Sequence, residues 1–159
     1  MNGYLLLKTL HIVSSVLLVG TGFGSAYYLY FVNRGASLEA RALVGRLVVR
    51  ADTWFTTPAA IVQPLSGAAL AHLAGVSLGT PWLLASLLLY AVAGACWLPV
   101  LVLQVRMANE AEAALREGRA LAPSFERDRR RWEALGYPAF VAMLAVYALM
   151  VNKPSLGLA

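Results

Sequence analysis

The chain has 159 residues, of which 60% are hydrophobic and 13% are charged, with a mean hydropathy of +0.67. This composition excludes a water-soluble globule, because soluble domains carry roughly 25% charged residues. It also excludes a disordered chain, and the single Cys96 excludes a disulfide scaffold. The net charge of +5 does not indicate nucleic-acid binding, since membrane proteins collect Lys and Arg to set their orientation.

Three stretches without a charged residue predict four membrane-spanning helices. Residues 9–33 and 134–152 each suffice for one span, since a helix needs about 20 apolar residues to cross the hydrocarbon core. Residues 53–105 suffice for two, divided by a glycine- and proline-containing turn at 75–81. The sequence therefore predicts an all-α, integral membrane four-helix bundle, a single transmembrane domain over 1–159, with spans at about 4–32, 53–74, 81–105 and 134–151.

The arginines predict the orientation of the bundle. Residues 34–50 hold four arginines and residues 106–131 hold seven, whereas the connection between the second and third spans holds none. By the positive-inside rule, both Arg-rich connections are cytoplasmic and both termini are outside. The N-terminal stretch lacks a charged n-region and exceeds the length of a signal-peptide core, so it is expected to be the first span.

Several residues carry local structural expectations. Trp54 and Trp132 are expected at the inner membrane interface, as part of an aromatic belt. Gly20 and Gly24 have the spacing of a close-packing face between membrane helices. Asp52, immediately before the second uncharged stretch, is expected to cap the start of the second span.

The only two histidines, His11 and His72, both lie within the expected spans. A polar side chain in hydrocarbon is costly and by default indicates function. His11 lies about two turns after the start of the first span, and His72 lies close to the end of the second. Because these spans run in opposite directions, both imidazoles are expected in the same, outer leaflet.

A pair of imidazoles on facing helices of a bundle is a known way to hold haem iron. We therefore interpret His11 and His72 as axial ligands of a b-type haem. Lys8, one turn outward from His11, and Lys153, after the fourth span, are candidate partners of the haem propionates. Met150 is an alternative to one imidazole as ligand. For either histidine alone, ordinary hydrogen bonding to a serine or a carbonyl is the competing interpretation.

Several segments resemble a loose bacterial superfamily that includes HemJ, the haem-associated protoporphyrinogen oxidase, and CopD-like copper-resistance membrane proteins. Residues 7–24, with His11 and the Gly20-Thr-Gly22-Phe-Gly24 segment, resemble its opening helix. The whole chain is similar to a family of predicted integral membrane proteins within it. The motifs that carry this likeness are Asp52-Thr-Trp-Phe-Thr-Thr-Pro58, Gln63-Pro-Leu-Ser-Gly67 and Leu149-Met-Val-Asn-Lys-Pro154.

The resemblance implies a role for His11, because the histidine of this first-helix motif is implicated in haem binding in HemJ-like proteins. HemJ-like sequences also carry an arginine after the glycine segment and an essential lysine in the third helix. Here residues 24–30 contain no arginine, and the expected third span contains no lysine. The resemblance therefore supports haem binding more than porphyrinogen oxidation.

The function expected from the sequence is haem b binding with a redox or electron-transfer role in the bacterial cytoplasmic (inner) membrane. Two alternatives stay open: a HemJ-like protoporphyrinogen oxidase, and a non-haem copper or small-solute transport protein or accessory subunit. No catalytic residue is assigned, so whether the protein is an oxidoreductase also stays open. The expected partners are the lipid bilayer, a redox partner or quinone, and further copies of this chain in a homo-oligomer.

Overall fold

A computed structural model describes residues 2–154, and this part of the chain is helical, as expected. Three of its helices are long and apolar enough to cross a membrane, namely α1, α4 and α5. The elements in chain order are α1 (Gly3–Gly35), α2 (Leu38–Ala51), the π-helical segment η1 (Asp52–Thr56), α3 (Thr57–Leu73), α4 (Pro81–Glu117) and α5 (Pro123–Asn152).

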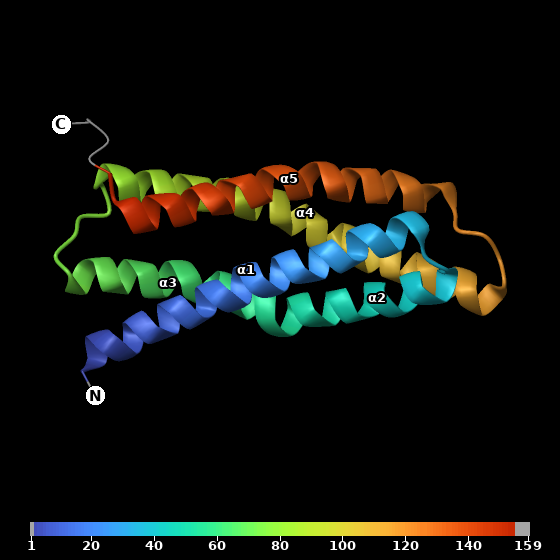
Figure 1. The fold of residues 1–159 in the computed structure, drawn as a ribbon, viewed down its shortest axis with the longest axis horizontal. Helices are drawn as coiled ribbons and strands as arrows, with labels where there is room; N and C mark the ends of the chain where they lie inside the picture. The colour runs from blue at the N-terminus through green and yellow to red at the C-terminus, as the bar shows by residue number, and fades with distance from the viewer. Residues whose placement is uncertain (1, 155–159) are drawn as a thin grey trace.

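The segments α2, η1 and α3 follow one another without a break and form one long bent helix (Figure 1). The expectation that Asp52 caps the start of a span is therefore wrong. Its backbone N–H bonds to the carbonyls of Val48 and Val49, inside the continuing helix. The arginines of α2 limit the uncharged stretch of the sequence, but they do not limit the helix, because arginine is itself a good helix former.

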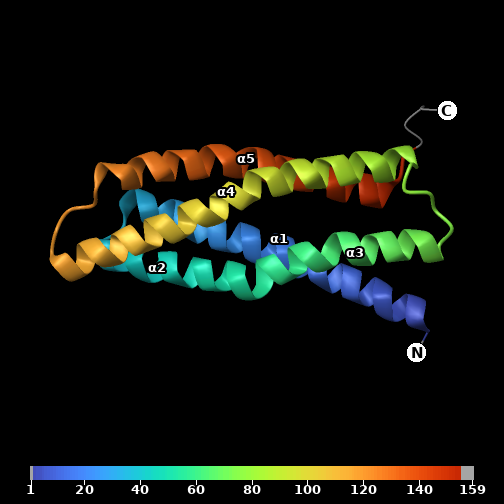
Figure 2. The same ribbon diagram turned by 180° about the vertical axis from the view of Figure 1, so that it is seen from behind.

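The four long helical segments run side by side, with the two Arg-rich regions at one end of the molecule (Figures 1 and 2). We call this end, which holds the arginines of residues 34–50 and 106–131, the charged end. The start of α1, the turn between α3 and α4, and the end of α5 lie at the opposite, apolar end. This shared placement of the two Arg-rich regions is the one that the sequence predicted.

The Arg-rich regions are mostly helix, and only residues 118–122 connect α4 to α5. Gly118 ends α4 with a left-handed backbone (φ 64°), which glycine adopts without strain. The arginines pair with carboxylates across and along the helices. The pairs include Arg34–Glu133 (2.9 Å), Arg46–Glu112, Arg106–Asp128 (3.1 Å), Arg119–Glu110 (2.6 Å) and Arg130–Glu126 (3.0 Å).

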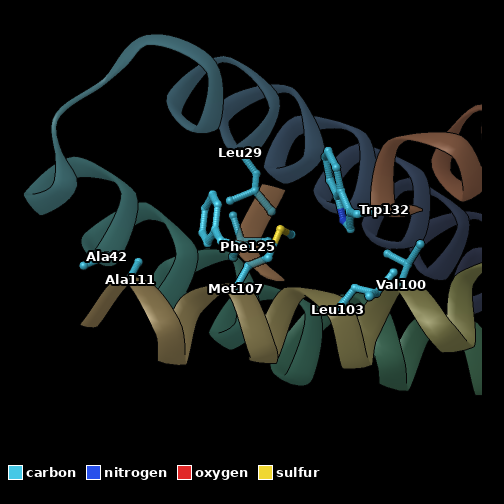
Figure 3. Packing of buried hydrophobic residues seen from close by; sticks show 9 residues of the cluster. Leu29, Ala42, Val100, Leu103, Met107, Ala111, Phe125 and Trp132 are labelled. Carbon is cyan, nitrogen blue, oxygen red and sulfur yellow. The ribbon is translucent and has the colours of Figure 1, made fainter. Parts of the chain in front are cut away.

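A cluster of buried hydrophobic residues lies toward the charged end, between α1, α2, α4 and α5 (Figure 3). Trp132 belongs to it and is only 5% exposed, so it does not face the lipid as a member of the expected aromatic belt would. Because α5 already begins at Pro123, Trp132 is an interior residue of a packed helix. Trp54, by contrast, is 71% exposed. The members are Leu29, Ala42, Val48, Val100, Leu103, Met107, Ala111, Phe125 and Trp132.

Small residues let α2 and α4 approach closely near the charged end. Ala108, Ala111 and Ala114 lie along one face of α4 and are at most 2% exposed. A Cβ atom on Gly45 of α2 would lie 3.3 Å from both Cα and Cβ of Ala108. That spacing leaves no free room for a side chain at residue 45.

Within this chain, Gly20 and Gly24 do not form the close-packing face expected of them. Apart from α1's own backbone and the adjoining residues, no atom lies within 4 Å of the place where a Cβ atom would stand on either residue. The glycine between them, Gly22, makes the contact instead, because its Cβ position lies 3.7 Å from Cγ2 of Thr56. The spacing alone could not tell which face of α1 meets the neighbouring helix.

A substitution at Gly45 tests the α2–α4 contact. Gly45→Val should destabilise the protein by about 1–3 kcal/mol, because the added atoms collide with the backbone of Ala108. Gly20→Val is the matched control, since it adds the same atoms to a helix position with open space. Unfolding of both purified variants in detergent measures the difference, and equal losses of stability would contradict the packing described.

The charged end should also respond to acid. Arg129 and Arg130 lie against Glu126 and lower the pKa of its carboxyl from 4.5 to about 2. Because the folded pKa lies below the unfolded one, ionised Glu126 stabilises the fold above about pH 4.5, and this contribution disappears as the pH falls toward 2. The melting temperature should therefore decline less steeply between pH 5 and pH 3 in Glu126→Gln than in the unchanged protein. Identical slopes would contradict this assignment.

Candidate functional site

His11 of α1 lies against α3, where both of its ring nitrogens have side-chain partners. Its Nδ1 lies 2.9 Å from Oγ of Ser66, and its Nε2 lies 3.3 Å from the amide nitrogen of Gln63. The hydroxyl of Ser14 donates to Oε1 of Gln63 at 2.5 Å. We call His11, Ser14, Gln63 and Ser66 the His11 cluster. It connects two helices whose polar residues are otherwise few.

Helix periodicity explains why these four side chains meet. His11 and Ser14 are three residues apart on α1, and Gln63 and Ser66 are three residues apart on α3. Residues at this spacing share one face of a helix. Both serines are only 4% exposed, so the two polar faces contact each other and are covered by the neighbouring helices.

The hydrogen bonds define which nitrogen of His11 carries the proton. The hydroxyl of Ser66 donates to the carbonyl of Val62 in its own helix, at 2.7 Å. Its oxygen is therefore left to accept a hydrogen bond from Nδ1–H of His11. The amide nitrogen of Gln63 can only donate, so Nε2 of His11 accepts. The cluster thus selects a neutral imidazole whose Nε2 lone pair accepts a hydrogen bond from Gln63.

Gly67 allows the imidazole to lie this close to α3. A Cβ atom at residue 67 would stand 3.1 Å from Cε1 of His11, closer than most side-chain contacts. One edge of the ring is thus packed against the backbone of α3. The Nε2 side, covered by the flexible side chain of Gln63, is the side that a ligand could reach by displacing one amide group.

His72 does not share this interface. It is exposed, and it lies five residues after Gly67, which is about 140° around the helix and about 7.5 Å along it. The two imidazoles are therefore on different faces of the α1–α3 pair. Within residues 2–154, no three side chains of His, Cys, Asp or Glu form a metal-binding group.

The other candidate residues lie at the apolar end. Lys8 is exposed on α1, one turn from His11. Lys153 caps the end of α5 in a left-handed conformation (φ 43°), and its Nζ lies 5.7 Å from the ring centre of Trp82. Met150 is half-buried on α5. Among residues 2–154, no hydrogen bond or ion pair links any of these three residues to the His11 ring.

Two tyrosines link the α1–α3 pair to α4 and α5. The hydroxyl of Tyr147 on α5 donates to the carbonyl of Ser15 at 3.0 Å. The hydroxyl of Tyr90 on α4 donates to the carbonyl of Ala60 at 2.7 Å. Both acceptors lie within one or two turns of the His11 cluster, so these bonds fix the cluster relative to the rest of the bundle.

The sequence interpretation allowed a serine as the hydrogen-bond partner of a single histidine, and Ser66 is such a partner of His11. It did not identify which serine, nor the parts played by Ser14 and Gln63. The signal was present, because each expected span contains a pair of polar residues three apart in an otherwise apolar segment. What the sequence did not contain was the rotation of the two helices that turns these pairs toward each other.

Loss of one hydroxyl tests the cluster. Ser14→Ala should cost about 1 kcal/mol of stability, because Oε1 of Gln63 then has no donor in an apolar surrounding. Ser15→Ala is the control, since the Ser15 hydroxyl bonds only to the carbonyl of Ile12 in its own helix. Unfolding in mixed detergent micelles compares the two variants. A loss in Ser15→Ala as large as that in Ser14→Ala would argue against the cross-helix bond.

The comparisons with known proteins agree with the helical, apolar architecture. Residues 5–154 match the model of a protein family described as predicted integral membrane protein (DUF2269). No curated protein and no solved structure matches the chain. Because the match covers nearly the whole sequence, this chain is a member of the DUF2269 family of integral membrane proteins.

Proposed function

We propose that this membrane protein binds haem b through His11 and takes part in a redox or electron-transfer step. The observation that carries the proposal is the tautomer of His11: Ser66 accepts from Nδ1–H, so Nε2 is unprotonated and its lone pair would be available to a metal once the Gln63 amide moves away. Neutral imidazole nitrogen is a common haem ligand. Iron-bound histidines usually donate their second ring N–H to a protein acceptor, which fixes the ring.

The residues around His11 leave only the Nε2 side of its ring for a haem iron. The hydrogen bond between Nε2 of His11 and Gln63 is long, at 3.3 Å, and joins two neutral groups. A rotation of the Gln63 side chain would release Nε2, while Ser66 and Gly67 would continue to orient the ring. A bound haem would supply the one-electron chemistry, and this chain would supply the ligand and an apolar surrounding.

The proposal assigns His11 as the axial ligand and gives His72 no ligand role, because its ring lies on another face of α3. Lys8, one turn from His11, is the proposed partner of a propionate. We further propose that the charged end lies in the cytoplasm of a bacterial cell, and that α3 with η1 forms a fourth span. Residues 52–73 are about 33 Å long as a helix, which matches the hydrocarbon core.

Absorption spectra of the purified full-length protein test the proposal. Protein produced in haem-supplied cells should show a Soret band, and His11→Ala should lose it. His72→Ala is the matched control and should keep the spectrum of the unchanged protein. Absence of a Soret band in the unchanged protein would refute haem binding. Loss of the band in His72→Ala alone would refute the assignment of His11 as the axial ligand.

The two alternatives from the sequence predict different results. A porphyrinogen oxidase would restore growth of a bacterium that lacks its own oxidase, and this would require His11. A copper-handling protein would contain copper but no haem, which metal analysis of the purified protein detects. The geometry at His11 favours haem over copper, because within residues 2–154 the hydrogen-bond partners of the ring are an amide and a hydroxyl rather than thiolate or thioether ligands.

A further inference from the structure

A second group of buried polar side chains lies nearer to the charged end than the His11 cluster. Asp52 and Thr56 of η1 and Gln104 of α4 are 3%, 2% and 5% exposed. Thr56 is seven residues, or about two helical turns, from Gln63, so the two groups are separate. We call these three residues the Asp52 cluster. Nothing in the proposed haem function uses it.

The Asp52 carboxylate is buried without a cationic partner. The hydroxyl of Thr56 donates to Oδ1 at 2.7 Å, and the side chain of Gln104 lies beside the carboxylate. The ion pairs found among residues 2–154 do not include Asp52. Arg46 and Arg106, on the helices beside η1, pair with other carboxylates. A buried anion without a counter-charge is strongly unfavourable.

The amide oxygen of Gln104 also lacks a partner. Oε1 is buried and accepts no hydrogen bond in the described structure. The amide group that carries this oxygen lies beside the Asp52 carboxylate. The cluster thus brings together a negative charge without a counter-ion and an oxygen with free lone pairs. Buried polar atoms of this kind are rare in proteins, and a bound ion is one recognised cause.

The π-helical turn gives the cluster its shape. The backbone N–H of Thr57 bonds to the carbonyl of Asp52, which is the five-residue spacing of a π-helix. Such wide turns occur frequently at functional sites in helices. Here the turn directs both Asp52 and Thr56 into the bundle, while Trp54 and Phe55 between them are at least 50% exposed.

We propose that Asp52, Thr56 and Gln104 form a binding site for a monovalent alkali cation, with Na⁺ as the expected ion. The site offers oxygen atoms from a carboxylate, a hydroxyl and an amide, which are hard ligands suited to such ions. One carboxylate balances a single positive charge. A divalent ion would leave a net buried charge, and divalent sites usually contain more carboxylates.

Thermal unfolding of the purified full-length protein in detergent tests the site. The melting temperature should rise with NaCl and reach a plateau, relative to choline chloride at equal ionic strength, because the ion binds only the folded state. Choline is too large to enter a buried site. Asp52→Asn should abolish the difference between the two salts. Asp128→Asn is the matched control, because Asp128 is equally buried but already paired with Arg106, and this variant should keep the difference.

Further measurements keep the proposal testable if Asp52→Asn fails to fold. Gln104→Leu removes one proposed ligand but keeps the carboxylate, and it should raise the Na⁺ concentration for half-saturation by about tenfold. Broadening of the ²³Na NMR line by the unchanged protein should report binding directly. Equal melting temperatures in the two salts, together with no line broadening, would overturn the proposal. A melting temperature that depends on pH but not on Na⁺ would also overturn it, because Asp52 would then bind a proton and not the ion.

Discussion

A polar side chain inside hydrocarbon finds no water, so its hydrogen bonds have to come from the protein. The α1–α3 pair depends on this constraint, because His11 and Ser14 of one helix bond to Gln63 and Ser66 of the other. These bonds fix both the rotation and the axial position of the two helices. The apolar end has few other contacts of this specificity, since most of the α1 and α5 segments there are not buried within the protein.

The charged end is stabilised by a different balance of forces. There α4 and α5 extend well beyond the length needed to cross a membrane, and their arginines and glutamates pair on the helix surfaces. The buried hydrophobic cluster also lies toward this end, between α1, α2, α4 and α5. In a segment surrounded by lipid the hydrophobic effect does not drive packing, and hydrogen bonds such as those of the His11 cluster contribute instead. The molecule thus changes its mode of packing along its length.

The sequence predicted the helical class, the common end of the two Arg-rich regions and the turn before Pro81, because each follows from the distribution of charges, glycines and prolines along the chain. It placed residues 34–50 in a connection and did not predict that α2 continues through η1 into α3, since charged residues on an exposed helix look like those of a connection. It expected a similar depth for His11 and His72, whereas His72 lies about 7.5 Å along α3 from Gly67, which contacts His11, and it did not predict their faces. Depth follows from counting residues along a helix, whereas the face depends on rotation, which the contacts of Gly67 and Ser66 with His11 determine.

The π-helical turn η1 sets how far the packing face of α3 is rotated from that of α2 within the bent helix. Before it, Gly45 of α2 packs against α4, and after it, Ser66 of α3 packs against α1. A π turn accommodates about one extra residue, so the segment that follows is rotated by about 100° relative to a continuous α-helix. Without this rotation, the residues of α3 that meet His11 would point toward another neighbour. The same turn buries the Asp52 carboxylate, so the register of the His11 cluster and the burial of an unpaired charge have one structural cause.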